Sequence, residues 1–223
     1  MGEDVRELIS VLKDVRDRLI GLYALSSAMI YLGFGTIVGL NILLDVLIYS
    51  RVPPPQNEVI IGAFWGVATL LLIALNVKIF GKPISRYKEI LHGKQERRKQ
   101  SKLKKSVGVL LIALIWFASF FIGGITGWYL SQAGIIEEYY SSQFGLLLAL
   151  ALGNTIIAAL TRERKPLACG ISLGLSATLL PLTGSFNNAW TYTASIIIVI
   201  YNLTGLAYMI EATRLVAGRR ITH

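Results

Sequence analysis

The stretch that decides the fold is VGVLLIALIWFASFFIGGITGWYL at 107–130, which contains no charged residue. A transmembrane helix needs about 20 mostly apolar residues to cross the hydrocarbon core of a bilayer. Backbone groups within lipid must also find their hydrogen bonds inside the segment, which favours a helix over a strand. We therefore interpret 107–130 as a transmembrane helix.

Five further stretches have the same apolar character. The chain of 223 residues is 54% hydrophobic and only 16% charged, with a mean hydropathy of +0.59. Its charges are concentrated between the apolar stretches, as expected of a chain in lipid. The predicted spans are 20–49, 59–80, 107–130, 144–160, 167–182 and 190–210. The fifth is short, and 184–188 is either an external turn or a re-entrant dip. The predicted fold class is all-α, a polytopic six-transmembrane-helix bundle.

The basic residues predict the orientation of this bundle. All 22 lysines and arginines except Arg51 lie before the first span, between Lys78 at the end of the second span and Lys105, in the fourth connection, or in the C-terminal tail. Positively charged connections favour the cytoplasmic side, so we expect a multi-pass protein of the cell membrane with both termini in the cytoplasm. The net charge of +9 then reflects the basic residues that hold this orientation in the membrane. The predicted divisions are a cytoplasmic helix at 1–19, transmembrane hairpins at 20–80, 107–161 and 162–213, a basic cytoplasmic loop at 81–106 and a cytoplasmic tail at 214–223.

The first division has the pattern of an amphipathic helix. Its apolar residues recur at spacings of three and four, which places them on one face. They are Val5, Leu8, Ile9, Leu12, Val15 and Leu19. The opposite face carries mixed charge, which suits packing against a partner helix or a second copy better than lying on anionic lipid. We expect either an extension of the first span that meets such a partner or a helix folded back on the cytoplasmic loop.

The basic loop contains seven lysines and arginines within 94–105. We expect this run to anchor the third span near anionic lipid headgroups, and an acidic protein partner is the alternative. No aromatic residue interrupts the run to stack on bases, which argues against nucleic acid. The candidate contact residues are Arg97, Arg98, Lys99, Lys102, Lys104 and Lys105.

Five polar residues within the spans are candidates for function, because polar groups in lipid are costly. Asn41 and Asp45 are four residues apart and share a helix face. Asp45 forms either a site or a wetted helix end. Asn76, Asn154 and Asn202 each lie in the second helix of a predicted hairpin. The five together can line a polar path, or the asparagines can form hydrogen bonds between helices.

Two other patterns concern packing. Small residues recur four positions apart, a spacing that lets helices approach closely. Gly62 and Gly66, and Gly123 and Gly127, are two such pairs. Near the end of the sixth span, Glu211 lies three residues before Arg214, and we expect these two charges to pair.

The sequence lacks the residues of familiar membrane enzymes. Its histidines, His92 and His223, lie outside the spans, so bis-histidine haem and histidine zinc sites have no ligands there. One cysteine, Cys169, forms neither an internal disulfide nor a cysteine metal site. We therefore predict no cofactor and no catalysis. The favoured hypothesis is a membrane transport protein or the membrane (permease) subunit of a transporter. The alternative is a non-transporting scaffold or regulatory protein that recruits partners through its N-terminal helix and basic loop.

Overall fold

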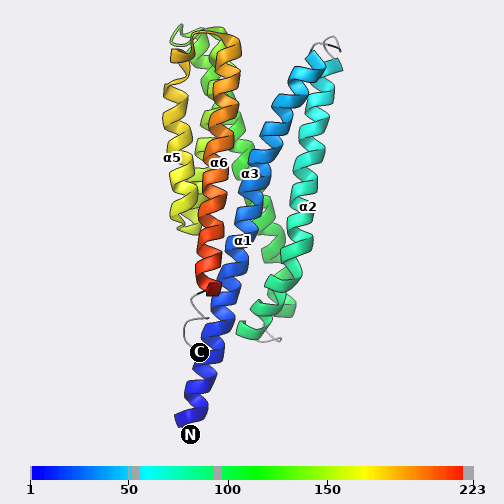
Figure 1. The fold of residues 1–223 in the computed structure, drawn as a ribbon, viewed down its shortest axis with the longest axis vertical. Helices are drawn as coiled ribbons and strands as arrows, with labels where there is room; N and C mark the ends of the chain where they lie inside the picture. The colour runs from blue at the N-terminus through cyan, green and yellow to red at the C-terminus, as the bar shows by residue number, and fades with distance from the viewer. Residues whose placement is uncertain (1, 50, 52–55, 93–96, 218–223) are drawn as a thin grey trace.

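The computed structural model describes residues 2–49, 51, 56–92 and 97–217. Within these ranges the chain forms six α-helices and two short 3-10 helices and contains no strand, which confirms the all-α prediction. The long helices lie side by side along the long axis of the molecule (Figure 1). The elements are α1 (Gly2–Tyr49), α2 (Gln56–His92), α3 (Arg97–Gln132), η1 (Glu138–Tyr140), α4 (Ser141–Thr161), α5 (Arg164–Thr178), η2 (Leu180–Thr183) and α6 (Phe186–Ala217).

Five of the six helices are long and apolar enough to cross a membrane. The qualifying segments are Val5–Leu44, Val59–Tyr87, Leu110–Gln132, Ser141–Thr161 and Ala189–Leu215. The exception is α5, whose 15 residues rise about 22 Å at 1.5 Å per residue, less than a hydrocarbon core of about 30 Å. The chain then passes through η2 and reverses at Gly184, whose φ of 73° suits glycine. A turn therefore joins α5 to α6.

The N-terminal segment is a direct continuation of the first span. One uninterrupted helix, α1, runs from Gly2 to Tyr49. Its first turns project beyond the lower end of the other helices, as drawn in Figure 1. The apolar side chains there are open: Val5 is 53%, Leu8 60% and Ile9 60% exposed. The extension of the first span is confirmed, and the alternative of a helix folded back on the cytoplasmic loop is wrong. The partner that would meet the extension stays a prediction.

The basic loop expected at 81–106 is helical in its described residues. α2 continues through Pro83 and ends at His92, and α3 begins at Arg97. The apolar residues at 84, 87 and 91 keep the helical spacing, and the lysines and arginines around them are good helix formers. Residues 81–92 and 97–106 of this predicted connection are therefore helical, and 93–96 are not among the described residues.

The core lies between α4, α5, α6 and one face of α1. Its buried side chains are Val38, Leu147, Leu150, Ala151, Cys169, Leu173, Ala177, Ala194, Ile197 and Tyr201. Glycines bring α3 against α4: a Cβ on Gly123 would lie 2.4 Å from the carbonyl oxygen of Gly145. One on Gly127 would lie 2.3 Å from the carbonyl oxygen of Ser141. The predicted small-residue packing is confirmed here, because these separations leave no room for a side chain.

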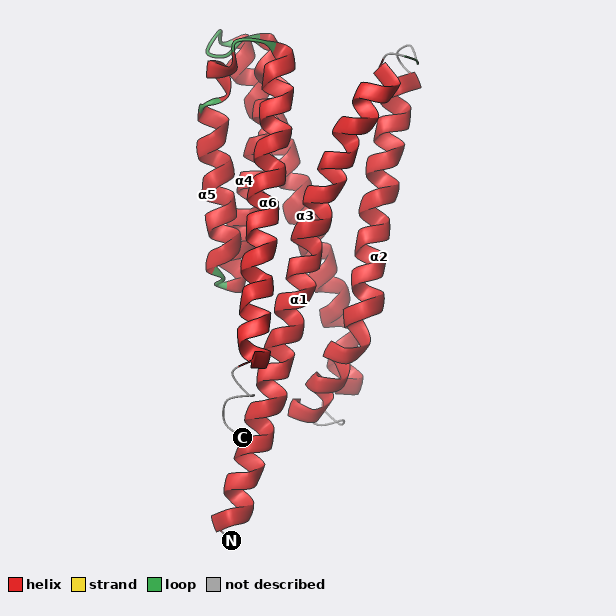
Figure 2. Cartoon of the chain, in the orientation of Figure 1, coloured by secondary structure: helices red, strands yellow, loops and turns green. Residues whose placement is uncertain are grey.

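The second helix is attached differently from the others. α1 packs along α6, and α4 packs against both α3 and α5, but α1 is the only described helix that packs extensively on α2. No residue in the apolar segment of α2 is buried. Gly62 and Gly66 of α2 have nothing within 4 Å of a built Cβ. The α1–α2 hairpin thus stands beside the α3–α6 unit and is joined to it through α1 (Figure 2).

Candidate functional site

The space between this hairpin and the α3–α6 unit contains a cleft of about 650 Å³. We call it the interhelical cleft. Side chains from α1, α2, α3, α4 and α6 form its walls. They are Phe34, Val38, Asn41, Ile42, Trp65, Thr69, Phe120, Leu146, Leu150, Trp190, Thr191, Thr193, Ala194 and Ile197.

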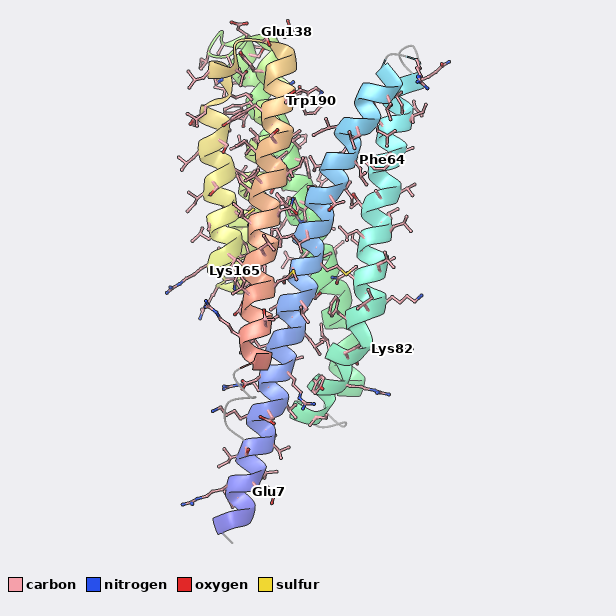
Figure 3. The ribbon with its side chains drawn as sticks, in the orientation of Figure 1. Glu7, Phe64, Lys82, Glu138, Lys165 and Trp190 are labelled. Carbon is pink, nitrogen blue, oxygen red and sulfur yellow. The ribbon has the colours of Figure 1, made fainter. Side chains whose placement is uncertain are left out.

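The cleft lies toward the end of the bundle at which α1 approaches α2 through the 50–55 connection. Trp190, which lines it, occupies the upper half of the molecule in Figure 3, as does Phe64 beside the lining Trp65. The labelled lysines, Lys82 and Lys165, lie in the lower half. The cleft therefore lies nearer the upper end of the bundle than these two lysines do, and Arg51 follows α1 at that upper end.

Aromatic rings form much of the cleft wall. The Phe34 ring lies 5.8 Å from that of Trp65, tilted by 49°, and so joins α1 to α2. Behind it, the Tyr201 ring of α6 lies 5.0 Å from Phe34. Phe120 and Trp190 complete the aromatic lining from α3 and α6. Such tilted ring pairs attract beyond their simple burial, so this part of the wall is cohesive.

Two buried polar side chains interrupt the apolar wall. Asn41 is 7% exposed, and Thr193 is 0% exposed. The Thr193 hydroxyl has no hydrogen-bond partner among the described residues. Other threonines of the bundle use the carbonyl one helical turn back: Thr204 donates to Ile200 at 2.8 Å and Thr126 to Ile122 at 2.8 Å. Thr193 is thus a buried donor at the cleft wall with nothing to bond.

The remaining predicted asparagines do not meet in a shared path. Asn76 pairs with α1: the Ser26 hydroxyl donates to its Oδ1 at 2.9 Å, and its Nδ2 donates to the Ser26 carbonyl at 2.8 Å. Half-buried Asn202 faces α1, 3.1 Å from a Cβ built on Gly35. Of the four predicted residues whose side chains the structure describes, only Asn41 lines the cleft. Asp45 lies in α1 one turn further on, and its side chain is outside the described residues.

Asn154 is the centre of a hydrogen-bonded cluster that joins three helices. The Tyr31 hydroxyl of α1 donates to its Oδ1 at 2.8 Å. Its Nδ2 donates to the Tyr201 hydroxyl of α6 at 3.0 Å and to the Leu150 carbonyl of its own helix at 2.8 Å. Asn154 is 1% exposed. This arrangement matches the alternative that we stated, in which the asparagine side chains bond helices together.

Charged groups form a separate cluster at the lower ends of α4, α5 and α6. Lys165 pairs with Glu211, and its Nζ lies 4.5 Å from the centre of the Tyr208 ring. The Tyr208 hydroxyl donates to Glu163. Glu211 thus pairs with Lys165, from another helix, where we expected Arg214. These contacts fasten the ends of the helices, because charge-assisted hydrogen bonds are stronger than neutral ones.

The predicted basic contact residues lie in the first turns of α3. Arg97 opens the helix, and Lys105 is two turns further along. The side chains of Arg97, Arg98, Lys99, Lys102, Lys104 and Lys105 are outside the described residues. Their contact with anionic lipid or with a protein partner stays a prediction.

No metal-ligand cluster of three histidine, cysteine or carboxylate side chains occurs in the part of the chain that the structure describes. Comparison of the chain with protein-family models, with curated proteins and with solved structures found no match. The site therefore has to be interpreted from its own geometry.

Proposed function

We propose that this chain is a membrane transport protein, or the membrane subunit of a larger transporter, whose substrate binds in the interhelical cleft. The observation that supports it is the cleft itself, about 650 Å³ within a bundle of membrane-length helices. Small-molecule sites typically enclose about 300–1,000 Å³ and combine apolar walls with a few polar groups. The cleft has both properties.

A transporter also needs a wall that can move. α2 supplies Trp65 and Thr69 to the cleft yet packs extensively on α1 alone. α1 packs along α6, so the wall that few contacts hold against the α3–α6 unit is α2. A movement of α2 relative to that unit would open and close the cleft, as hinge movements do at other binding sites. The proposal places the substrate pathway along this interface. Asn41 lines it, whereas Asn76 and Asn154 bond helices to one another away from it.

The test measures distances across the moving wall. Spin labels at Val59→Cys on α2 and Ile125→Cys on α3, in a Cys169→Ala background, report that separation by double electron–electron resonance in lipid nanodiscs. A control pair at Ile125→Cys and Leu175→Cys lies within the α3–α6 unit. All three labelled positions are exposed, so the labels do not disturb the core.

Transport predicts at least two populated distances for the α2–α3 pair and one for the control pair. A single narrow distance for both pairs, with and without candidate substrates, would contradict it. Co-purification from native membranes in mild detergent then separates the two versions of the proposal. A stoichiometric nucleotide-hydrolysing subunit identifies the chain as a permease subunit, and its absence favours a self-sufficient carrier.

A specific observation also favours the alternative function, a scaffold that recruits partners. The apolar stripe on the first turns of α1 is exposed, and it keeps the spacing of three and four that suits a partner helix. Leu8→Ser with Leu12→Ser would then release bound proteins that wild type retains, whereas Lys13→Gln, on the polar face, would not. If both variants keep the same partners as wild type, this stripe does not recruit them.

A further inference from the structure

We infer that the interhelical cleft binds an uncharged amphipathic molecule, with an apolar chain against the aromatic wall and one oxygen acceptor on the Thr193 hydroxyl. The inference rests on the proposed function, since it names the class of molecule that the cleft would handle. It depends on three properties of the lining: its apolar surface, its lack of charge and its one unsatisfied donor.

The apolar surface selects a hydrocarbon portion. Ten of the fourteen lining residues are apolar, and four of them present aromatic rings from four different helices: Phe34, Trp65, Phe120 and Trp190. Burying apolar area against such a wall is favourable in proportion to the area removed from water. The flat rings also suit an extended or cyclic hydrocarbon, because their faces offer broad contact at little cost in side-chain entropy.

The charge of the lining excludes an ionised headgroup. None of the described side chains that line the cleft is acidic or basic. A charge taken into a site of low polarity without an opposite charge is strongly disfavoured. A neutral hydroxyl, ester or carbonyl group has no such penalty when it finds a hydrogen bond.

Thr193 offers that hydrogen bond. Its hydroxyl is buried at the cleft wall with no partner among the described residues, unlike Thr204 on the same helix, which donates to Ile200. A buried donor left without an acceptor is costly, and a ligand oxygen placed beside it would remove the cost. Asn41, buried on the facing helix α1, adds polar surface beside the same space.

The volume favours a small molecule over a protein helix. A helix about 10 Å wide fills about 650 Å³ in roughly one and a half turns, so the cleft cannot enclose a helix that crosses the membrane. A molecule with one extended hydrocarbon portion fits this size.

The experiment uses bromoalkyl probes, because bromine in contact with tryptophan quenches its fluorescence. The full chain in nanodiscs is titrated with 12-bromododecanol, with bromododecane as the probe that lacks the hydroxyl, and with 12-bromododecanoate as the charged probe. The cleft signal is the saturable quenching that disappears in Trp65→Phe with Trp190→Phe. Non-saturable quenching from probe dissolved in lipid is subtracted.

Thr193→Val keeps the shape of the side chain and removes its hydroxyl. We expect it to weaken binding of the alcohol between about 2-fold and 10-fold and to leave binding of the bromoalkane unchanged. Thr126→Val is the matched control, since that hydroxyl bonds within α3 and lies outside the cleft lining. This control variant should change the binding of neither probe.

Several results would overturn the inference. They are saturable quenching that survives the paired tryptophan substitutions, equal effects of Thr193→Val on alcohol and alkane, and tighter binding of the carboxylate than of the alcohol. Absence of saturable quenching, with a second membrane protein co-purifying, would assign the cleft to a protein contact instead. Saturable alcohol binding with a single α2–α3 distance would remove transport and keep the ligand class. Two populated α2–α3 distances without saturable alcohol binding would keep transport and remove the ligand class.

Discussion

Replacing Asn154 with leucine tests whether the buried asparagine holds helices together or serves a polar path. The side chain is 1% exposed and makes two bonds to other helices, with the Tyr31 hydroxyl at 2.8 Å and the Tyr201 hydroxyl at 3.0 Å. Leucine has the same number and branching of side-chain heavy atoms and can make neither bond. The substitution therefore removes polar contacts with little change in packing.

The expected loss follows from these contacts. Each interhelical hydrogen bond in a membrane contributes about 0.6 to 1.7 kcal/mol, so the two bonds account for about 1 to 3 kcal/mol. A tyrosine hydroxyl that stays buried without a partner adds about 1 to 3 kcal/mol. We expect Asn154→Leu to lower the free energy of unfolding by about 2 to 5 kcal/mol.

The assay is reversible unfolding in mixed micelles by increasing the fraction of a denaturing detergent, followed by circular dichroism. A double-mutant cycle with Tyr31→Phe isolates the pairwise contribution. Tyr31→Phe alone should lower the free energy of unfolding by less than Asn154→Leu does, because only one interhelical hydrogen bond is lost. In Asn154→Leu/Tyr31→Phe one orphaned hydroxyl is gone, so the double variant should be about 0.5 to 2 kcal/mol more stable than the sum of the single effects predicts.

Strict additivity of the two substitutions would refute this reasoning, as would a variant as stable as wild type. Unchanged stability together with lost transport would return Asn154 to the role of a pathway residue.

Three further predictions concern packing, charge and topology. Gly127→Ala should lower the free energy of unfolding by about 1 to 3 kcal/mol, because its methyl group would overlap the backbone of α4. Gly62→Ala, which has open space around its Cβ, should leave that free energy unchanged, and thermal unfolding of both variants measures the difference. Lys165→Gln should lower the free energy of unfolding by less than about 1 kcal/mol, because its partner Glu211 is 41% exposed. In a denaturation series, about 0.5 M salt should remove most of this difference from wild type, because salt screens the ion pair. The orientation is tested with a cysteine added at either end of the chain in a Cys169→Ala background. Each added cysteine should resist a membrane-impermeant maleimide in intact cells and react with it after lysis. Labelling of either end in intact cells would contradict the predicted orientation.

The helices were predictable because the signal for each is local. An uncharged run such as 107–130 is apolar whatever the rest of the chain does, and Leu110–Gln132 of α3 has the expected length and composition. The spacing of Gly123 and Gly127 likewise predicted a close approach that the structure shows against α4. The helix through 84–92 has the same kind of local signal, because its apolar residues keep helical spacing and its lysines and arginines favour helix.

The cleft could not be predicted in this way. Trp65 and Thr193 are far apart in the sequence and meet only because of how α2 and α6 are rotated and placed. Neither belongs to a motif, and a threonine in an apolar helix ordinarily bonds to its own backbone, as Thr204 does. The sequence also allowed two roles for Asn154, and only the positions of tyrosines on other helices distinguish them.

The cleft and the loose attachment of α2 have a common origin in the spacing of small residues along α1. In the lower half of the bundle, Ala24 and Ala28 are buried against Tyr208 and Ala212 of α6, so the two helices lie close together. Further up, Gly35 continues this contact, with Asn202 3.1 Å from a built Cβ. Beyond Gly39 the residues that line the cleft from α1 are larger, Asn41 and Ile42, and close approach ends there. α1 therefore lies closest to α6 in the lower half of the bundle, and above it Val38 and Ile42 still pack against the core that α6 shares. A movement of the wall that α2 supplies would then alter the width of the cleft most at its upper end.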